Sequence, residues 1–184
     1  MPNVPVLQAR RVKAKVCLVG EHAVGKTSLI RRFVLDEFDD RYIVTLGAKV
    51  SKKELMFVAE DTELQMDMTV WDIMGSRSFR ELLREAYFHG AQGVLAVCDI
   101  TRSTTLDEID GWMESVFRTI GPVPAVIVVN KNDLAGNAAF TEAQVRQSAD
   151  AFDCPYFYAS ARTGENVEAI FRQLGLAISQ HVVA

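Results

Sequence analysis

Cysteine is scarce in this sequence, and its thiols are widely separated. Cys17, Cys98 and Cys154 are the only three in 184 residues, and each lies in or beside an apolar run. An odd number of cysteines at such spacings argues against a disulfide framework and against a cysteine-rich zinc site. We therefore expect buried thiols in a protein of a reducing compartment.

Two further absences concern membranes. No apolar run approaches the ~20 residues that span a bilayer, and no signal peptide is visible. Residues 180–184 contain no cysteine, so prenylation at this end of the chain is chemically impossible. We expect a cytoplasmic protein without a transmembrane segment. Peripheral membrane association would need a native chain that continues past Ala184, or a partner that tethers it.

An excess of positive charge is also missing. The formal net charge is −4, which gives no electrostatic reason to expect nucleic-acid binding. Arg10, Arg11, Lys13 and Lys15 form a short basic run, which we interpret as the solvated entrance to a strand rather than a polyanion or membrane patch. The length suits one compact domain and is too short for two ordinary ones.

Short apolar runs alternate with segments of helical periodicity. Residues 1–12 carry two prolines and no clear period, so we predict a flexible tail there and one domain over residues 13–181. The apolar runs suit parallel strands covered by helices on both faces; they are residues 16–19, 68–71, 94–99, 125–129 and 156–159. Helices are predicted over residues 26–35, 78–89, 104–120, 141–152 and 166–180, with Thr141 and Gln144 as a capping box.

One stretch departs from this alternation. Residues 48–58 and 64–71 follow each other without room for a helix, and the polar residues 60–62 supply a turn. We predict a hairpin that adds one antiparallel edge strand. The expected fold is an α/β domain with a doubly wound, six-stranded, mostly parallel sheet of five parallel strands and one antiparallel edge strand, with about five helices. Ligands of such sheets bind beyond the carboxyl ends of the strands.

The most specific motif follows the first predicted strand. Residues 20–27 read Gly-Glu-His-Ala-Val-Gly-Lys-Thr and fit the pattern G-x-x-x-x-G-K-[ST]. Backbone N–H groups of such a loop wrap phosphates, and the positive end of the following helix points at them. Lys26 would reach the β- and γ-phosphates, and the Thr27 hydroxyl would ligate Mg²⁺. The predicted phosphate-binding residues are Gly20, Glu21, His22, Ala23, Val24, Gly25, Lys26, Thr27 and Ser28.

A second motif, residues 71–75, closes another apolar strand with the sequence Trp-Asp-Ile-Met-Gly. The carboxylate of Asp72 would hold Mg²⁺ through a bound water, and Gly75 would let a backbone N–H approach the γ-phosphate.

The third motif selects the base. Residues 130–133 read Asn-Lys-Asn-Asp and close a buried strand. The Asp133 carboxylate can accept hydrogen bonds from N1–H and the exocyclic amino group of guanine, whereas adenine would leave it unpaired; a buried mismatch of this kind discriminates by roughly 10⁴-fold in the best cases. The stem of Lys131 would lie against the base, and Asn130 belongs to the same motif. This selectivity argues against a P-loop kinase or ATPase.

The last motif, Ser160, Ala161 and Arg162, would offer backbone N–H groups to the guanine carbonyl oxygen. In order and spacing, the four motifs resemble those of the Ras superfamily of small GTPases over roughly residues 13–180, closest to its Rab-like and Ras-like branches. Residues 87–91 resemble the family's Tyr-Tyr-Arg-Gly-Ala, residues 99–101 its Asp-Ile/Val-Thr, and residues 42–47 its first switch segment. The resemblance implies the G domain of a P-loop NTPase.

The same resemblance implies further roles. Thr45 would ligate Mg²⁺ and bond the γ-phosphate only when GTP is bound, Phe38 would lie edge-on to guanine, and Tyr42 would line the nucleotide site. Residues 36–47 and 73–85 would be two switches that are ordered by the γ-phosphate. Two such switches imply three partners: an effector, an exchange factor and an activating protein. The resemblance further implies a monomer with Mg²⁺ as its cofactor, GTP as its substrate and GDP as its product. Because Rab-like relatives carry lipidated C-terminal cysteines, this chain is either truncated or soluble like prokaryotic relatives; both remain open.

Three residues depart from the family pattern. Ser76 replaces a glutamine that positions the attacking water, His22 replaces a Gly or Ser, and Ala23 replaces a Gly. With Lys26, Thr45, Gly75 and Ser76 as the catalytic set, we predict slow GTP hydrolysis, because positioning supplies most of phosphoryl-transfer catalysis and a misplaced group costs on the order of 10²-fold. Arg77, His22 or a partner would otherwise substitute for the glutamine. The alternative function is a GTP-loaded scaffold that does not hydrolyse.

Overall fold

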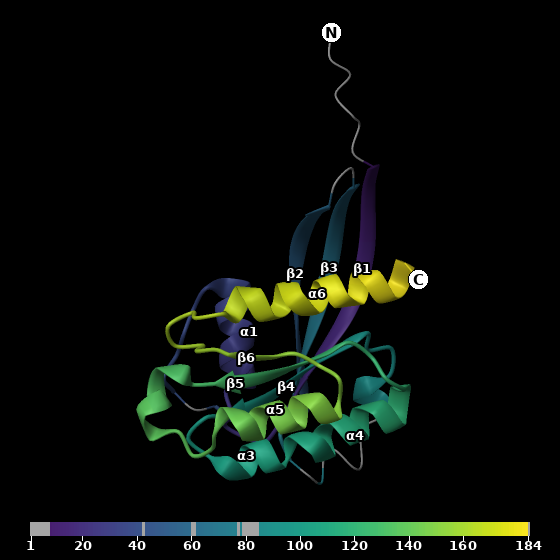
Figure 1. The fold of residues 1–184 in the computed structure, drawn as a ribbon. Helices are drawn as coiled ribbons and strands as arrows, with labels where there is room; N and C mark the ends of the chain where they lie inside the picture. The colour runs from purple at the N-terminus through teal and green to yellow at the C-terminus, as the bar shows by residue number, and fades with distance from the viewer. Residues whose placement is uncertain (1–7, 42, 60–61, 77, 79–84, 184) are drawn as a thin grey trace.

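A single mixed sheet forms the centre of the molecule (Figure 1). The computed structural model describes residues 8–41, 43–59, 62–76, 78 and 85–183. Within them the strands are β1 (Gln8–Val19), β2 (Ala48–Ala59), β3 (Thr62–Ile73), β4 (Gly93–Asp99), β5 (Ala125–Asn130) and β6 (Tyr156–Tyr158), in the spatial order β2-β3-β1-β4-β5-β6. All neighbouring pairs are parallel except β2 and β3, which form the predicted hairpin at one edge. The predicted α/β fold is confirmed.

Helices cover both faces of this sheet. They are α1 (Lys26–Leu35), α3 (Ser103–Asp107), α4 (Ile109–Ile120), α5 (Glu142–Ala151) and α6 (Val167–Val183), with a 3₁₀-helix η1 (Asn132–Asn137) after β5. The predicted capping box is present at α5, where the Thr141 side chain accepts from the backbone N–H of Gln144 and the Gln144 side chain accepts from the backbone N–H of Thr141.

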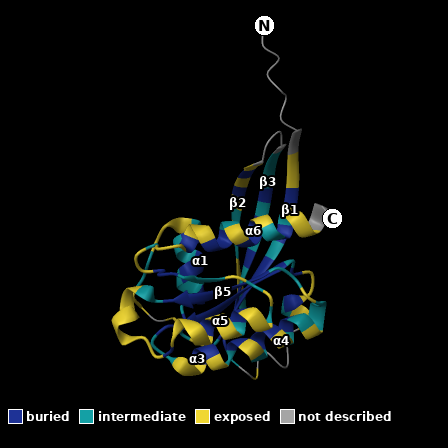
Figure 2. Ribbon diagram, in the orientation of Figure 1, coloured by how far each residue is buried: buried dark blue, intermediate teal, exposed yellow. Residues whose placement is uncertain are grey.

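Burial explains this layering. β4 and β5 are buried along their whole length and appear dark blue in Figure 2, whereas the helices carry exposed residues on their outer sides. Residues of α1 and α6 form one core cluster with the sheet, in which the rings of Phe33 and Phe171 stack with centroids 3.9 Å apart. Residues of α3, α4 and α5 form a second cluster with the other face, around Trp112. The two cores hold the strand ends in fixed positions.

The structure corrects several predicted boundaries. β1 begins at Gln8, so residues 8–12 belong to a strand and not to the predicted loose tail; the assignment of a separate tail and domain otherwise stays a prediction. The predicted helix over 104–120 is divided at Glu108 into α3 and α4. Of the predicted helix over 78–89, residues 78 and 85–88 are helical, and 79–84 lie outside the described residues.

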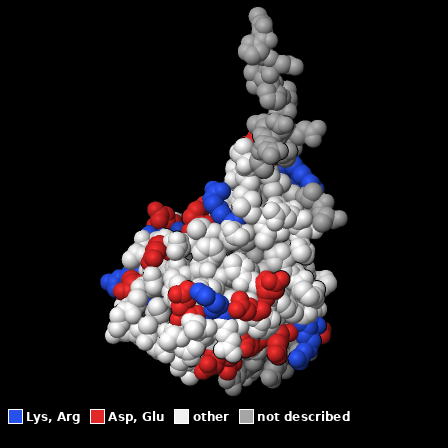
Figure 3. Space-filling view, in the orientation of Figure 1, with Lys and Arg blue, Asp and Glu red and all other residues white. Residues whose placement is uncertain are grey.

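The cysteines, the charged side chains and the helices can each be compared with the expectations from the sequence. Cys17 and Cys98 are buried free thiols, and Cys154 is a partly buried one. Acidic and basic side chains are interspersed on the face that Figure 3 shows. Among the described residues, no helix is both long and apolar enough to pass through a bilayer.

Candidate functional site

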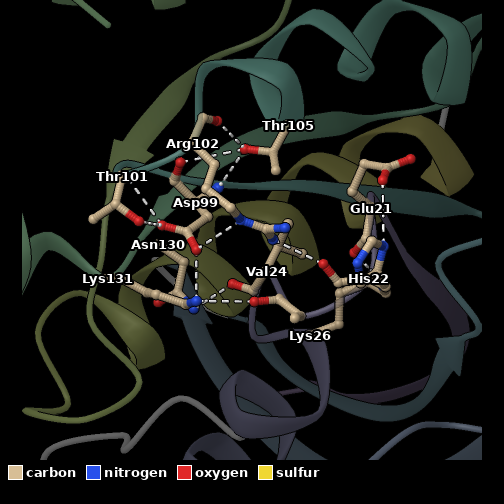
Figure 4. Close-up of polar contacts among 11 residues, drawn as sticks. Glu21, His22, Val24, Lys26, Asp99, Thr101, Arg102, Thr105, Asn130 and Lys131 are labelled. Atoms are coloured by element: carbon tan, nitrogen blue, oxygen red, sulfur yellow. Dashed lines mark hydrogen bonds and ion pairs between the residues drawn. The ribbon is translucent and has the colours of Figure 1, made fainter. Parts of the chain in front are cut away.

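The loop between β1 and α1 bends back on itself through three residues with positive φ. Gly20, Ala23 and Gly25 have φ of 138°, 58° and 101°. The Lys26 side chain folds over this loop, and its Nζ donates hydrogen bonds of 2.7 Å to the carbonyl oxygens of Gly20 and Glu21. Figure 4 shows the side chains that surround the loop. This arrangement concentrates backbone N–H groups and one cation at the carboxyl end of β1.

Lys26 is electrostatically poised for an anion. Its side chain is buried, and this burial lowers the pKa of the ammonium group to about 8, although Asp72 and Glu21 act in the opposite direction. A buried ammonium gains from a nearby negative charge, since desolvation penalises the charged form when it stands alone. A phosphate group in the loop would supply that charge.

Three oxygen-bearing side chains meet beside the loop. The hydroxyls of Thr27 and Thr45 lie 3.0 Å apart, and both donate hydrogen bonds to Oδ2 of Asp72, the one from Thr45 over 3.3 Å. Oδ1 of Asp72 is buried and has no hydrogen-bond partner among the described residues. Burial raises the pKa of this carboxyl above its ordinary value despite those hydrogen bonds. A cation would satisfy the buried oxygen and favour the charged form.

The chemistry of this cluster fits Mg²⁺. Hydroxyl and carboxylate oxygens are hard ligands, and Mg²⁺ binds to proteins through few such groups together with water and phosphate oxygens. In the part of the chain that the structure describes, no cluster of three or more His, Cys, Asp or Glu side chains offers another metal site. By the chemistry of their oxygen atoms, Thr27, Thr45 and Asp72 are the residues that would hold such an ion.

The residues of the two base-side motifs bond one another. The Ser160 hydroxyl donates to Oδ1 of Asp133 over 2.6 Å, and the backbone N–H of Ala161 donates to Oδ1 of Asn130 over 3.2 Å. Carboxylate oxygens accept more than one hydrogen bond, so Asp133 keeps the capacity to receive donors from a base. These contacts bring the segments that follow β5 and β6 together, as the parallel sheet requires.

One cavity of about 440 Å³ joins the phosphate side and the base side. Most of the predicted site residues line it: His22, Ala23, Gly25, Lys26, Thr27, Ser28, Phe38, Thr45, Asp72, Gly75, Asn130, Lys131, Asp133, Ala161 and Arg162. The other described members of the predicted set are not among the lining residues: Gly20, Glu21, Val24, Ser76 and Ser160. Tyr42 lies outside the described residues. Their individual roles stay predictions.

Gly75 connects the second predicted switch to the phosphate loop. A Cβ atom at Gly75 would lie 2.5 Å from the backbone nitrogen of His22 and 2.6 Å from the carbonyl oxygen of Gly20. Only glycine permits such a close approach of two backbones. The segment that leads to Ser76 is thereby held directly against the loop.

Sequence reasoning missed several residues of the site. Arg31 lines the cavity, and it lies four residues after Thr27, so helix periodicity could have placed it on the same face. Arg32 donates to the carbonyl oxygens of Ala161 (2.9 Å) and Arg162 (2.6 Å), and it thereby supports the loop after β6. Nothing in the local sequence around Arg32 indicates that long-range contact.

Comparisons with known proteins agree with this geometry. A family model described as "Ras family" matches residues 15–180. The chain is similar to the Ras-related protein SEC4 of Candida albicans, with 31% identity over 167 residues, which cover 90% of this chain and 77% of that protein. It shares 35% identity over 175 residues with the Ras-related protein Rab-36 of Mus musculus, covering 92% of this chain and 64% of that protein. With the GTP-binding protein ypt1 of Schizosaccharomyces pombe it shares 27% identity over 169 residues, or 91% and 81% of the two chains.

Proposed function

The chain belongs to the Ras family of small GTPases, and from this premise we propose that it is a nucleotide-dependent switch. It binds GTP and GDP with Mg²⁺, hydrolyses GTP slowly and binds an effector in its GTP form. The similarity of Rab-type relatives bears out the expected Rab-like branch. The observation that carries the proposal is the meeting of Thr45 with Thr27 and Asp72. It links the segment of residues 36–47 to the phosphate loop.

Each part of the cavity would have a separate task. Backbone N–H groups of residues 20–25 and the Lys26 ammonium would hold the phosphates, while Asp133 would orient guanine. The hydroxyls of Thr27 and Thr45 would hold Mg²⁺ directly, and Asp72 would hold it through a bound water. The ion would neutralise the charge that builds up on the phosphate oxygens. The backbone N–H of Gly75 would hold the γ-phosphate side.

Slow hydrolysis follows from the side chain at position 76. The short hydroxyl of Ser76 cannot reach as far as a glutamine carboxamide, and orienting water is a main component of the barrier reduction in phosphoryl transfer. His22 lines the cavity nearby, where it would compete for space with water or with a partner's arginine. Arg77, the other residue of the chain that would substitute for the glutamine, lies outside the described residues.

Exposed apolar side chains support a partner at the first switch. Ile43, Val44 and Leu46 are 66%, 56% and 84% exposed, although they flank Thr45, whose hydroxyl turns towards Asp72. Contiguous apolar side chains at a protein surface are typical of interaction sites. Loss of the bond between Thr45 and the γ-phosphate after hydrolysis would release these neighbours, which gives nucleotide-dependent binding a physical basis. We propose that an effector, an exchange factor and an activating protein bind to residues 36–47 and 73–85, and that the protein is a monomer.

The rate of phosphate release under single-turnover conditions tests the catalytic part. Wild type should release phosphate from GTP slowly, and Ser76→Gln should accelerate release by at least about tenfold. Ser78→Gln is the matched control, since Ser78 is an exposed residue of the same segment. If Ser76→Gln behaves like the control, the explanation of slow hydrolysis is wrong.

The second candidate is a scaffold that stays loaded with GTP. It is favoured by Ser76 and by the position of His22 at the cavity. Both candidates bind GTP, so the same experiment separates them. No phosphate release above the spontaneous rate, from wild type or from Ser76→Gln, would favour the scaffold.

A further inference from the structure

Every carbonyl of the phosphate loop from Gly20 to Val24 accepts a hydrogen bond from a side chain. Lys26 bonds the first two, Gly20 and Glu21. The next three accept from outside the loop: His22 from Nη2 of Arg102 (2.8 Å), Ala23 from Nζ of Lys131 (2.9 Å) and Val24 from Nδ2 of Asn130 (2.9 Å). Figure 4 shows these donors converging on the loop.

The direction of the carbonyls determines the direction of the N–H groups. Within one planar trans peptide, the C=O of a residue and the N–H of the next residue point in opposite directions. A donor that holds the His22 carbonyl therefore also turns the N–H of Ala23 the other way. Lys26, Lys131 and Asn130 belong to the predicted motifs, whereas Arg102 belongs to none of them.

Asp99 holds both of the cations that flank Ala23. Its Oδ2 accepts from Nε of Arg102 over 3.2 Å and from Nζ of Lys131 over 2.5 Å. Asp99 is buried at the end of β4, and its Oδ1 accepts from both the backbone N–H and the hydroxyl of Thr101. A buried carboxylate with this many donors has a fixed orientation, so it fixes both cations.

Ala23 is the residue that needs such support. Its φ of 58° lies in the left-handed region, which is unfavourable for a residue that has a Cβ atom. The peptide before Ala23 is held by Arg102 through the His22 carbonyl, and the peptide after it by Lys131 through the Ala23 carbonyl. Since both bonds start from groups anchored on Asp99, the two peptides around Ala23 are held as one unit.

We propose that Arg102 is a positioning residue of the nucleotide site. Together with Asp99 and Lys131 it forms a clamp that keeps Ala23 left-handed and turns the N–H of Ala23 away from Arg102, to the side of the loop where the β-phosphate would bind. Arg102 is not among the residues that line the cavity, so it would act through the His22 carbonyl and not by touching the nucleotide. This inference rests on the proposed binding of guanine nucleotides and adds to it a residue that controls how tightly the phosphates are held.

The dissociation rate of a fluorescent GDP analogue, in the presence of Mg²⁺, tests the clamp. Arg102→Ala should speed dissociation about tenfold, the effect of losing a charge-assisted hydrogen bond. Arg102→Lys keeps the charge but cannot bond Asp99 and His22 at once, so it should speed release about threefold. Arg118→Ala removes the same charge from an exposed site on α4 and should change nothing.

Two further measurements separate the clamp from a general loosening of the fold. GMP lacks the β-phosphate, so Arg102→Ala should change GMP affinity by less than about twofold. Ala23→Gly removes the strain, so adding Arg102→Ala to it should speed GDP release by less than about threefold. Equal losses of GMP and GDP affinity, an undiminished effect in the Ala23→Gly background, or an Arg102→Lys rate equal to wild type would each overturn the clamp.

The outcome for wild type separates the two proposals. If wild type does not bind the GDP analogue, the proposed function fails and the clamp with it. If wild type binds the analogue and Arg102→Ala matches Arg118→Ala, only the clamp fails. Melting temperatures of both variants show whether Arg102→Ala is folded, and Arg102→Lys provides the test if it is not.

Discussion

The side-chain amide of Asn130 donates a hydrogen bond of 2.9 Å to the carbonyl oxygen of Val24 and thereby joins the end of β5 to the loop after β1. The next residue of that loop, Gly25, lies so close that a Cβ atom there would be 2.2 Å from the same amide nitrogen. The motif that would recognise the base and the loop that would hold the phosphates are therefore built as one unit.

Replacement of Gly25 should break this unit. Gly25→Ala forces a Cβ atom against Asn130 and places alanine at a φ of 101°, so we expect GDP affinity to fall between about ten- and a hundredfold. Gly136→Ala is the matched control, because no heavy atom lies within 4 Å of a Cβ atom added there. Equal GDP affinity of the two variants in an equilibrium titration would contradict the close packing of Gly25 against Asn130.

Asp72→Asn should have opposite effects on stability and on metal dependence. Because burial raises the pKa of the Asp72 carboxyl, its charged form costs free energy in the folded protein without metal, and the neutral amide should raise the thermal midpoint of the nucleotide-free protein. The same change should weaken Mg²⁺ binding about 10- to 100-fold.

The measurement is GDP release with and without a chelator. Chelation should speed release from wild type strongly and from Asp72→Asn only weakly. Asp150→Asn on the exposed side of α5 should respond to the chelator as wild type does. A full chelator response in Asp72→Asn would remove Asp72 from the metal site.

The pH dependence of stability should reveal the charge on Asp99. Burial raises the pKa of this carboxyl, but hydrogen bonds from Lys131 and Thr101 outweigh burial and hold the pKa below its ordinary 3.8. A depressed pKa means that the carboxylate stabilises the folded state above pH 3.8 and that this contribution disappears as the pH falls through the folded value. Asp99→Asn should therefore lower the free energy of unfolding by about 1–3 kcal/mol at pH 7 and 5, with a difference that shrinks below pH 3.8.

Asp110 provides the control of opposite sign. Burial raises the pKa of its carboxyl above 3.8, so the charged form disfavours folding at neutral pH. Asp110→Asn should stabilise the protein at pH 7, and that gain should vanish on acidification. Chemical unfolding of wild type and both variants from pH 7 to pH 3 measures the two differences; a parallel response of both variants would contradict the assigned charges.

The sequence predicts the sheet because its inner strands are buried on both faces. Continuous apolar runs such as those in β4 and β5 are easily recognised in the sequence. Each predicted motif follows a run of this kind. The first part of β1 was missed for a physical reason. Val12 and Ala14 alternate there with exposed Arg11 and Lys13, so only one face of the strand is apolar, and two nearby prolines suggested a tail.

The rest of the site depends on contacts between distant segments. Arg102 meets His22 across 80 residues, and Arg32 meets Arg162 across 130. A single arginine in a helix or at its start has no local pattern that indicates its partner. The carbonyl-binding side chains of the phosphate loop thus become recognisable only in three dimensions.

Asp133→Asn should exchange one base preference for another. A carboxamide can donate a hydrogen bond where the carboxylate only accepts. The variant should therefore lose affinity for GDP by at least about a hundredfold. It should gain affinity for xanthosine diphosphate, whose base has a carbonyl in place of the amino group of guanine. Competition titrations with both nucleotides measure the exchange, and Asp153→Asn, at an exposed position after α5, should leave the preference for GDP unchanged.

The central claim is that this cavity selects guanine nucleotides. The most direct test is displacement of a fluorescent GDP analogue from wild-type protein by GTP, GDP and ATP in the presence of Mg²⁺. The account predicts that GTP and GDP displace the analogue at stoichiometric concentrations, whereas ATP does not at a concentration at least about a thousandfold higher. Displacement by ATP at concentrations similar to those of GTP would contradict it.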